Sequence, residues 1–392
     1  MPIHIYSKRL VIAVTLYSCL LVAVACESPA PPPDSTATLP LASPTPSAAT
    51  TQPPATLPTA RPSPTSPETK PTIGATPKRA TNLEGHFVFV GVDGELWIED
   101  AGAGNARLFY QVNGNGYVNA PSFSPDGKQI AFTASSFTKD GSTSEEIRIT
   151  NVDGTNPRVV ISSNDPKTSI DYPAWSPDGN ALFVTQDSSA QPSNEHVEID
   201  RISVNGGALS KVIDDGREAN VSADGKKIVF ARYDSKTYAA SLWIANSGGS
   251  GAKRLVDDGT FATLFGARFS PDGQSIVFAA SGPPSRKLPG VQGYMQETPG
   301  NEGACAVSIV FICLVETAQA HGLPWDLWLV NPTGTKFERL TNIGADSPVP
   351  AWSRDGKQIA FFDATGIYLL DWQKKSIHQV SDSRGYGGFD WR

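Results

Sequence analysis

The sequence predicts an all-β protein, a six-bladed β-propeller that is closed by its C-terminal strand and preceded by a disordered tether. Three observations predict this fold class. An aromatic residue, the tetrapeptide Ser-Pro-Asp-Gly and a short apolar strand recur along residues 83–392. Six copies of a further apolar strand accompany them, and the last residues of the chain repeat the beginning of the pattern.

Composition separates an N-terminal leader and tether from an acidic C-terminal part. The 392 residues carry 32 Lys and Arg against 39 Asp and Glu, a net charge of −7. Residues 1–82 contribute +3, so residues 83–392 contribute −10. The 39% of hydrophobic residues is enough for a sizeable core, and the acidic balance lacks the basic surface of a nucleic-acid-binding protein.

The N-terminus has the features of an export signal. Lys8 and Arg9 precede the apolar run 10–25, which would form a helix of about 24 Å, short for a stable membrane span. The segment Ala23-Val24-Ala25-Cys26 resembles the lipobox of bacterial lipoproteins, whose cysteine receives a diacylglyceryl group before the leader is cleaved. We therefore expect residues 1–25 to be a lipoprotein signal peptide and Cys26 to be lipidated.

Two alternatives to lipidation remain open, an ordinary secretory signal cleaved after Ala25 and an uncleaved N-terminal anchor. All three interpretations place the C-terminal part outside the cytoplasm. The first anchors it to the bacterial membrane through the lipid on Cys26.

Residues 26–82 are expected to be the lipidated cysteine and a disordered linker. Between residues 27 and 82, Pro, Thr, Ser and Ala account for 42 of 56 residues, and no aromatic residue occurs. This segment buries too little apolar surface to offset an ordering entropy of about 1–2 kcal/mol per residue. As an extended polyproline-type spacer it reaches up to roughly 170 Å.

The repeat in residues 83–392 centres on five Asp-Gly turns, at Asp126, Asp178, Asp224, Asp272 and Asp355. Their spacings of 52, 46, 48 and 83 residues fit four short strands per unit, with an insertion at 282–324 in blade 5. Proline suits the second position of a type I turn, and glycine supplies the left-handed residue that closes a bulged hairpin. The aspartates can accept bonds from nearby backbone amides, so we interpret them as turn formers rather than catalytic acids.

The other strands follow from apolar segments between these turns. Third strands are predicted at 96–98, 147–149, 197–199, 242–244, 327–329 and 367–369, and fourth strands at, for example, 158–161 and 339–341. Residues 86–91, 94–99 and 106–110 would supply three strands of a blade that lacks its first. Because Trp391 stands where Trp175 and Trp352 stand in complete repeats, we expect the terminal strand to complete that blade and remove an open sheet edge.

The repeats resemble the WD40-like (PD40) repeats of the TolB family, over essentially all of residues 85–392. The resemblance implies a six-bladed propeller. It does not imply one function, because the same blades occur in periplasmic binding proteins and in the non-catalytic propellers of prolyl oligopeptidases. The tether replaces the separate N-terminal domain of TolB, which puts a Tol–Pal role in doubt.

Candidate binding residues lie where the long loops and the mouth of the channel are expected. The long loops are predicted at 135–146, 187–196, 233–241 and 282–324, on the face opposite the tight hairpins. The residues just before the first strands would line the channel mouth, namely Asn119, Asp171, Tyr172, Arg217, Glu218 and Phe265.

Cys305 and Cys313 are the only cysteines after residue 82, and outside the cytoplasm a disulfide between them is expected. Eight residues span about 26 Å as a strand or about 12 Å as a helix, against roughly 4.4–6.8 Å between bridged Cα atoms. The segment between them would have to fold back for a disulfide to form. The sequence alone therefore does not decide between the bridged and the unbridged state.

Two functional hypotheses follow, with no catalytic motif, metal site or cofactor site recognised in the sequence. The first is a monomeric, membrane-tethered, non-enzymatic propeller that binds a protein, peptide or glycan of the cell envelope and no nucleic acid. The alternative is a polysaccharide lyase or hydrolase that acts in the propeller channel. Convergence of three or more His, Asp or Glu side chains in the channel would favour the enzyme.

Overall fold

The computed structural model describes residues 83–392 except 138–142, 164, 166–167, 189–195, 235–236, 238, 283, 286–287 and 290–323. The expected signal peptide, lipidation site and linker, with Cys26, lie outside the described residues. So do Cys305, Cys313 and most of the expected insertion. Within the described ranges, no helix is long and apolar enough to cross a membrane.

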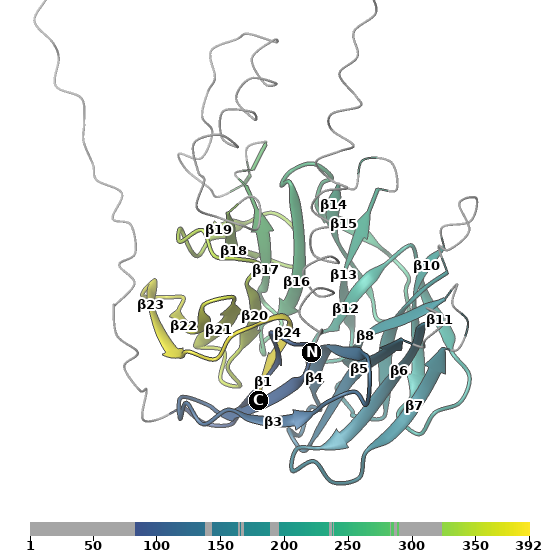
Figure 1. The fold of residues 1–392 in the computed structure, drawn as a ribbon. Helices are drawn as coiled ribbons and strands as arrows, with labels where there is room; N and C mark the ends of the chain where they lie inside the picture. Colours follow the sequence, from purple (N-terminus) through teal and green to yellow (C-terminus); the bar gives the residue numbers. More distant parts are fainter. Residues whose placement is uncertain are drawn as a thin grey trace, which may run out of the picture. The chain divides into compact units, whose positions relative to one another are not determined.

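The described residues form 24 strands in six four-stranded antiparallel sheets, which are the blades of a propeller (Figure 1). From the inner to the outer strand, blade 1 contains β24 (Gly385–Trp391), β1 (His86–Gly91), β2 (Leu96–Asp100) and β3 (Arg107–Tyr110). Blade 2 contains β4 (Gly116–Phe123), β5 (Gln129–Phe137), β6 (Thr143–Asn151) and β7 (Arg158–Ser163). Blade 3 contains β8 (Ser169–Trp175), β9 (Ala181–Asp187), β10 (Val197–Ser203) and β11 (Ser210–Asp214).

The remaining three blades follow in chain order with the same strand order. Blade 4 contains β12 (Arg217–Val221), β13 (Lys227–Tyr233), β14 (Ala240–Asn246) and β15 (Lys253–Val256). Blade 5 contains β16 (Thr263–Phe269), β17 (Ile276–Ser281), β18 (Trp325–Val330) and β19 (Phe337–Arg339). Blade 6 contains β20 (Val349–Trp352), β21 (Gln358–Asp363), β22 (Gly366–Asp371) and β23 (Ser376–Ser381). This architecture confirms the predicted fold class.

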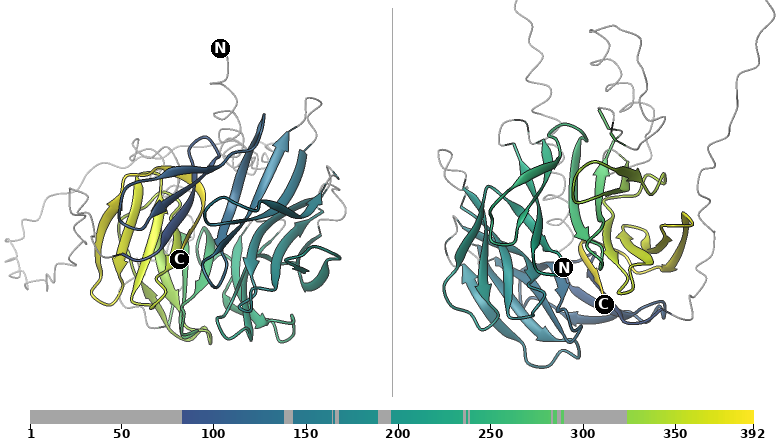
Figure 2. Two further views of the ribbon diagram at one scale, coloured as in Figure 1. Left: turned by 90° about the horizontal axis from the view of Figure 1, so that it is seen from below. Right: turned by 180° about the vertical axis from the view of Figure 1, so that it is seen from behind.

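The six inner strands form a closed ring around the axis. Each of β4, β8, β12, β16, β20 and β24 contacts the next inner strand, and β24 contacts β4 again. The buried apolar side chains form six clusters, and each cluster joins two neighbouring blades. Because a blade buries one face against each neighbour, the core is a set of apolar layers between the sheets. Figure 2 shows the arrangement of the sheets in two further views.

The ring is closed by pairing the two ends of the described chain, as the sequence predicts. In Figure 1, β24 (yellow) lies beside β1 (dark blue), with Phe87 opposite Trp391 and Phe89 opposite Phe389. The Phe87 and Trp391 rings have centroids 5.5 Å apart, and the Trp391 indole N–H donates to the Glu84 carbonyl at 3.1 Å. The inner edge of β1, which would otherwise expose Phe87, is therefore paired and covered.

The Asp-Gly hairpins have the predicted geometry. In the first of them, Asp126 accepts hydrogen bonds from the Ser124 hydroxyl at 2.7 Å and from the Lys128 N–H at 3.1 Å, and Gly127 has φ +74°. The other four hairpins repeat these aspartate bonds. These bonds lower the pKa of all five aspartates, which confirms their interpretation as turn formers.

Two predicted boundaries are wrong. Most of the expected loop 135–146 is strand, because β5 and β6 continue pairing as far as Phe137 opposite Thr143. The fourth strand of blade 5 is β19 rather than 339–341, because regular pairing ends at Trp328 opposite Arg339 and only one further backbone bond follows, from the Leu340 N–H to the Leu327 carbonyl at 2.8 Å. The Thr341 hydroxyl then accepts a bond from the Leu327 N–H at 2.9 Å, so a side chain takes the place of a backbone acceptor.

Candidate functional site

Five of the six inner strands are interrupted by a register shift against the second strand of their blade. A residue with positive φ lies at each of these shifts, with φ +46° at Ala120, +55° at Tyr172, +55° at Glu218, +66° at Gly266 and +109° at Gly387. An extra residue in one strand bends that strand and re-aims the side chains around it. Non-glycine residues in this conformation cost of order 1–3 kcal/mol each, so the surrounding structure must hold Tyr172 and Glu218 in place.

These bulges lie at one end of an axial cavity of about 830 Å³. We define the bulge end by Asn119, Tyr172, Glu218, Tyr233 and Phe265, which line the cavity where the bulges occur. We define the hairpin end by the Asp-Gly turn residues that line it, namely Pro125, Pro177, Ala223, Pro271 and Arg354. The cavity therefore runs along the inner strands from their bulges to their hairpins.

The bulge end holds a carboxylate among phenol rings. One Glu218 oxygen accepts a bond from the Gly266 N–H of the next blade at 3.0 Å, and burial raises the pKa of its carboxyl group. The negative charge of Glu218 is the main cause that raises the pKa of Tyr172 well above its usual value, with burial second. Burial, followed by the same charge, raises the pKa of Tyr233. Both phenols therefore stay protonated, and the Tyr233 hydroxyl donates to the Leu264 carbonyl at 3.2 Å.

Arg268 and Asp390 extend this polar lining along the axis. The carboxylate oxygens of Asp390 accept bonds from the Phe123 N–H at 2.7 Å and from its neighbour Trp391 N–H at 2.9 Å. Burial raises the pKa of Asp390, whereas these bonds and the charge of Arg268 oppose that shift. The charge of Arg268 thus acts on two anchored acids of the lining, Glu218 and Asp390.

The structure brings four of the six predicted channel-mouth residues to the cavity. Asn119, Tyr172, Glu218 and Phe265 line it, at its bulge end. All six residues lie within the inner strands rather than just before them, because the strands begin earlier than predicted. Asp171 is absent from the lining and is held by three hydrogen bonds, from the Asn119 amide at 2.9 Å, the Thr133 hydroxyl at 2.6 Å and the Tyr172 N–H at 2.6 Å.

Arg217 is also absent from the lining. Its guanidinium lies 2.6 Å from the Asp187 carboxylate, so it forms an ion pair between blades 4 and 3. Asp171 and Arg217 thus tie neighbouring blades together rather than facing the channel.

Arg268 and Asp390 also line the cavity but were not among the residues predicted from the sequence. Both directly precede the aromatic residue of their repeat, Phe269 and Trp391. Asn220 holds the equivalent position and accepts a bond from the Phe269 N–H at 2.9 Å. The residue that precedes the aromatic residue of each repeat is the signal that identifies this second ring of channel residues. Residues at the same position of successive repeats lie at equivalent places around the propeller axis.

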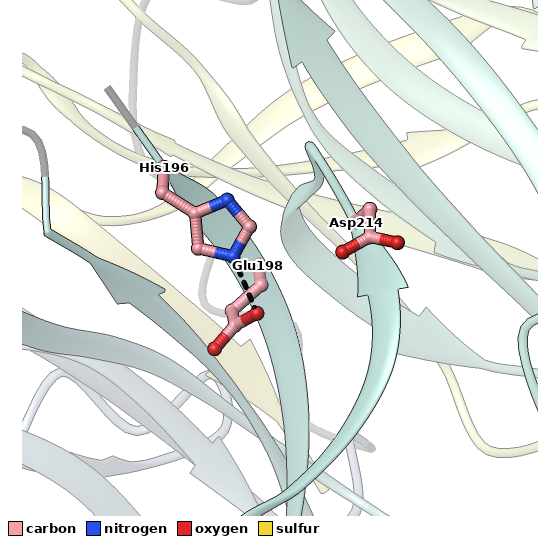
Figure 3. A group of neighbouring side chains, drawn as sticks. All are labelled: His196, Glu198 and Asp214. Atoms are coloured by element: carbon pink, nitrogen blue, oxygen red, sulfur yellow. Dashed lines mark hydrogen bonds and ion pairs between the residues drawn. The ribbon is translucent and has the colours of Figure 1, made fainter. Parts of the chain in front are cut away.

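A second group of polar side chains lies on the outer strands of blade 3. His196, Glu198 and Asp214 each offer a ligand atom, and these atoms lie within 4.8 Å of one another (Figure 3). Among the described residues, this is the group of three or more His, Cys, Asp or Glu that could hold a metal ion. No metal site was predicted here, although His196, Glu198 and Asp200 alternate along the chain.

Comparison with known proteins agrees with this closed ring of six blades around an axial cavity. Residues 86–298, more than half of the chain, match the TolB β-propeller domain family (PD40). The chain belongs to this family. No curated protein matches the chain in sequence.

Solved structures share the fold at low sequence identity. TolB from Acinetobacter baumannii is 15% identical with a TM-score of 0.55, and the match covers 78% of this chain and 66% of that one, just under two thirds. A chain of the nidogen/laminin complex is 12% identical with a TM-score of 0.53, covering 78% and 97%. The tricorn protease is 17% identical with a TM-score of 0.52, covering 77% and 26%. At these identities the likeness concerns the fold alone.

Proposed function

We propose that this chain is a non-enzymatic binding protein of the bacterial cell envelope, whose channel takes up a segment of a protein, peptide or glycan partner. The axial cavity carries the proposal. Its volume of about 830 Å³ lies within the range of about 300–1,000 Å³ for ligand sites, and apolar and aromatic surfaces surround a few polar groups.

The Glu218 carboxylate at the bulge end favours a ligand group that donates hydrogen bonds. Glu218 offers a carboxylate beside the protonated phenols of Tyr172 and Tyr233, and Phe265 adds an aromatic face. An ammonium, a guanidinium or a sugar hydroxyl would complement this set. Proteins and glycans both supply such groups.

The hydrogen bonds of the channel carboxylates support binding over hydrolysis or elimination. Glu218 and Asp390 accept backbone N–H bonds from neighbouring blades, at 3.0 and 2.7 Å. A general acid or base must exchange a proton with its substrate, whereas these bonds hold the two groups as fixed acceptors that tie the ring together. We therefore keep the lyase or hydrolase as the outcome that would contradict the proposal.

The location is part of the same proposal. We infer that Cys26 is lipidated after removal of residues 1–25 and that residues 27–82 hold the propeller away from the membrane surface. A Cys26→Ala variant should leave the membrane fraction and appear in the soluble extract. A variant that still partitions into detergent with the membranes would contradict the lipid anchor.

The binding proposal is tested by capture from envelope extract with the full chain and two variants. Glu218→Gln combined with Tyr172→Phe should lose the captured partner, because the variant removes one charge and one donor from the bulge end. Val159→Ser, on the exposed outer strand of blade 2, should keep it. A partner retained equally by all three proteins, or depolymerisation of an envelope polymer that Glu218→Gln abolishes, would contradict the proposal.

A further inference from the structure

The outer strands of blade 3 place five charged or ionisable side chains on one face. His196 directly precedes β10, and Glu198 and Asp200 lie on it, at alternate positions that share a face of a strand. In the adjacent strand β11, Asp214 pairs with Glu198, and Lys211 pairs with Asp200.

A register shift in this pairing brings Lys211 to the same face as Asp214. Residues three apart in a regular strand point to opposite faces. The pairing skips Val212, so Lys211 and Asp214 both follow the face of β10 that carries Glu198 and Asp200. Val212 instead packs against the apolar cluster between blades 3 and 4.

The interatomic distances within this group are short. The His196 Nε2 atom lies 2.7 Å from a Glu198 carboxylate oxygen. The Lys211 ammonium lies 2.9 Å from Asp214 and 3.5 Å from Glu198. His196 and Asp214 are largely open to solvent, whereas the Glu198 side chain is 15% exposed. An ion could reach the group from solvent and meet a carboxylate that is already partly desolvated.

Asp200 provides an independent observation at this group. It is 2% exposed, and its Oδ2 atom is buried without a hydrogen-bond partner. It stands at the alternate position from Glu198 on β10 and opposite Lys211 on β11, on the face that carries the group. A buried carboxylate oxygen without a donor is unfavourable, and a cation bound at this group would compensate it.

An ion-pair network around Lys211 is the alternative interpretation of this group. Its ammonium lies between Asp214 and Glu198 and already balances one negative charge. When Glu198, Asp200 and Asp214 are all ionised, two of their three negative charges are nevertheless not balanced by this ammonium. Because Lys211 has a half-exposed, flexible side chain, its ammonium can move into solvent when a more highly charged cation arrives.

We propose that His196, Glu198 and Asp214, with Asp200 beside them, form a binding site for a divalent transition-metal cation such as Zn²⁺, which displaces the Lys211 ammonium. Imidazole and carboxylate together suit Zn²⁺, whereas Mg²⁺ and Ca²⁺ prefer oxygen ligands alone. Ligand atoms within 4.8 Å of one another need only small side-chain movements to meet one ion at about 2.0–2.2 Å. The site lies on the third and fourth strands of its blade, apart from the channel formed by the first strands, and does not depend on the proposed function.

Calorimetric titration of the metal-free full chain with Zn²⁺, together with thermal unfolding, tests the proposal. We expect saturable binding that raises the unfolding temperature. His196→Ala and Asp214→Asn should each weaken this site at least tenfold. If His196→Ala destabilises the fold, Asp214→Asn still tests the site, because Asp214 is exposed on the outer strand of the blade and its replacement should leave the fold intact.

Two further variants distinguish a metal site from a surface ion pair. Lys211→Met should tighten Zn²⁺ binding several-fold, because it removes the competing ammonium. His86 lies 2.9 Å from Asp100 on blade 1 without further metal-binding side chains grouped around it among the described residues, so His86→Ala is the matched control and should not alter binding. Zn²⁺ binding that persists unchanged in His196→Ala and Asp214→Asn, or that Lys211→Met fails to tighten, would overturn the proposal.

Discussion

At the scale of single residues, the serine of the repeated hairpin is as important as its aspartate. In all five Asp-Gly hairpins the serine hydroxyl accepts a bond from the N–H five residues later, at 2.9 Å. These serines are buried, and each also donates to its aspartate. Serine is therefore present in every copy, whereas the proline is replaced by Ala223 and Arg354 in two of them.

Ser176→Ala should destabilise the protein by about 1–3 kcal/mol, because it leaves the buried Ala181 N–H without an acceptor. Chemical denaturation followed by tryptophan fluorescence would measure the loss. Ser250→Ala, on an exposed turn of blade 4, is the control and should change stability by less than about 0.5 kcal/mol. Equal effects of the two substitutions would contradict this role of the serine.

The hairpin aspartates should make the stability of the fold depend on pH in the acidic range. Hydrogen bonds from Ser176 and from Asn180 lower the pKa of Asp178 from 3.8 to about 2 in the folded protein. Because the folded-state pKa is depressed, ionised Asp178 stabilises the fold above the unfolded value, and this contribution is lost as the pH falls through the folded value.

The difference in unfolding temperature between the wild type and Asp178→Asn should therefore be largest near neutral pH. It should narrow between about pH 4 and pH 2. Thermal unfolding followed by circular dichroism over this range checks the expectation. A difference that stays constant with pH would show that the charge of Asp178 contributes nothing.

At the scale of elements, the bulges of the inner strands explain how strands shape the channel. The same left-handed position is occupied by alanine, tyrosine, glutamate and glycine in blades 2 to 5. Only glycine adopts this conformation without steric cost. The blades that carry Tyr172 and Glu218 there hold a strained backbone in exchange for a side chain in the channel.

Ala120→Gly should stabilise the protein by about 1 kcal/mol, because Ala120 has φ +46° and glycine relieves the strain at this position. Ala174→Gly, in the regular part of the inner strand of blade 3, is the control and should lower stability instead. If the bulge is strained, the denaturation midpoint shifts up for Ala120→Gly and down for Ala174→Gly relative to the wild type. If it is not strained, both midpoints shift in the same direction.

At the scale of the whole molecule, stability depends on the pairing of β24 with β1. Each apolar cluster lies between two blades, so a gap in the ring exposes the clusters on both of its sides. Glu99 adds a buried polar link between blades 1 and 6, because its carboxylate accepts a bond from the Ser381 hydroxyl at 2.8 Å. Closure is thus distributed over apolar and polar contacts.

Trp391→Ala should cost about 3–5 kcal/mol, because it removes a buried ring packed on Phe87 and the bond to the Glu84 carbonyl. We expect hydrogen exchange to accelerate first in β1 and β24. The exposed Val92→Ala in the same blade is the control, with an expected change within about 0.5 kcal/mol. A loss for Trp391→Ala as small as that of the control would contradict the role of closure.

The repeat made most of the fold predictable. Ser-Pro-Asp-Gly specifies a tight hairpin locally, and five copies with a partial sixth at Trp391 specify the number of blades and the way the ring closes. The ends of individual elements were less predictable. The polar residues 143–146 read as a loop, yet β6 includes them because cross-strand pairing with β5 continues beyond the apolar pattern.

The candidate site was predictable only in part, for a geometric reason. The sequence by itself determined the hairpins, the strand order and the six-fold ring, because these follow from local turn chemistry and a repeated pattern of buried side chains. Only the tertiary structure decided that Glu218 faces the cavity while Arg217 pairs with Asp187, and that Val212 bulges so that Lys211 joins Asp214. One extra residue in a strand changes which face each following side chain takes, and the pairing of neighbouring strands, rather than local sequence, sets where that residue falls.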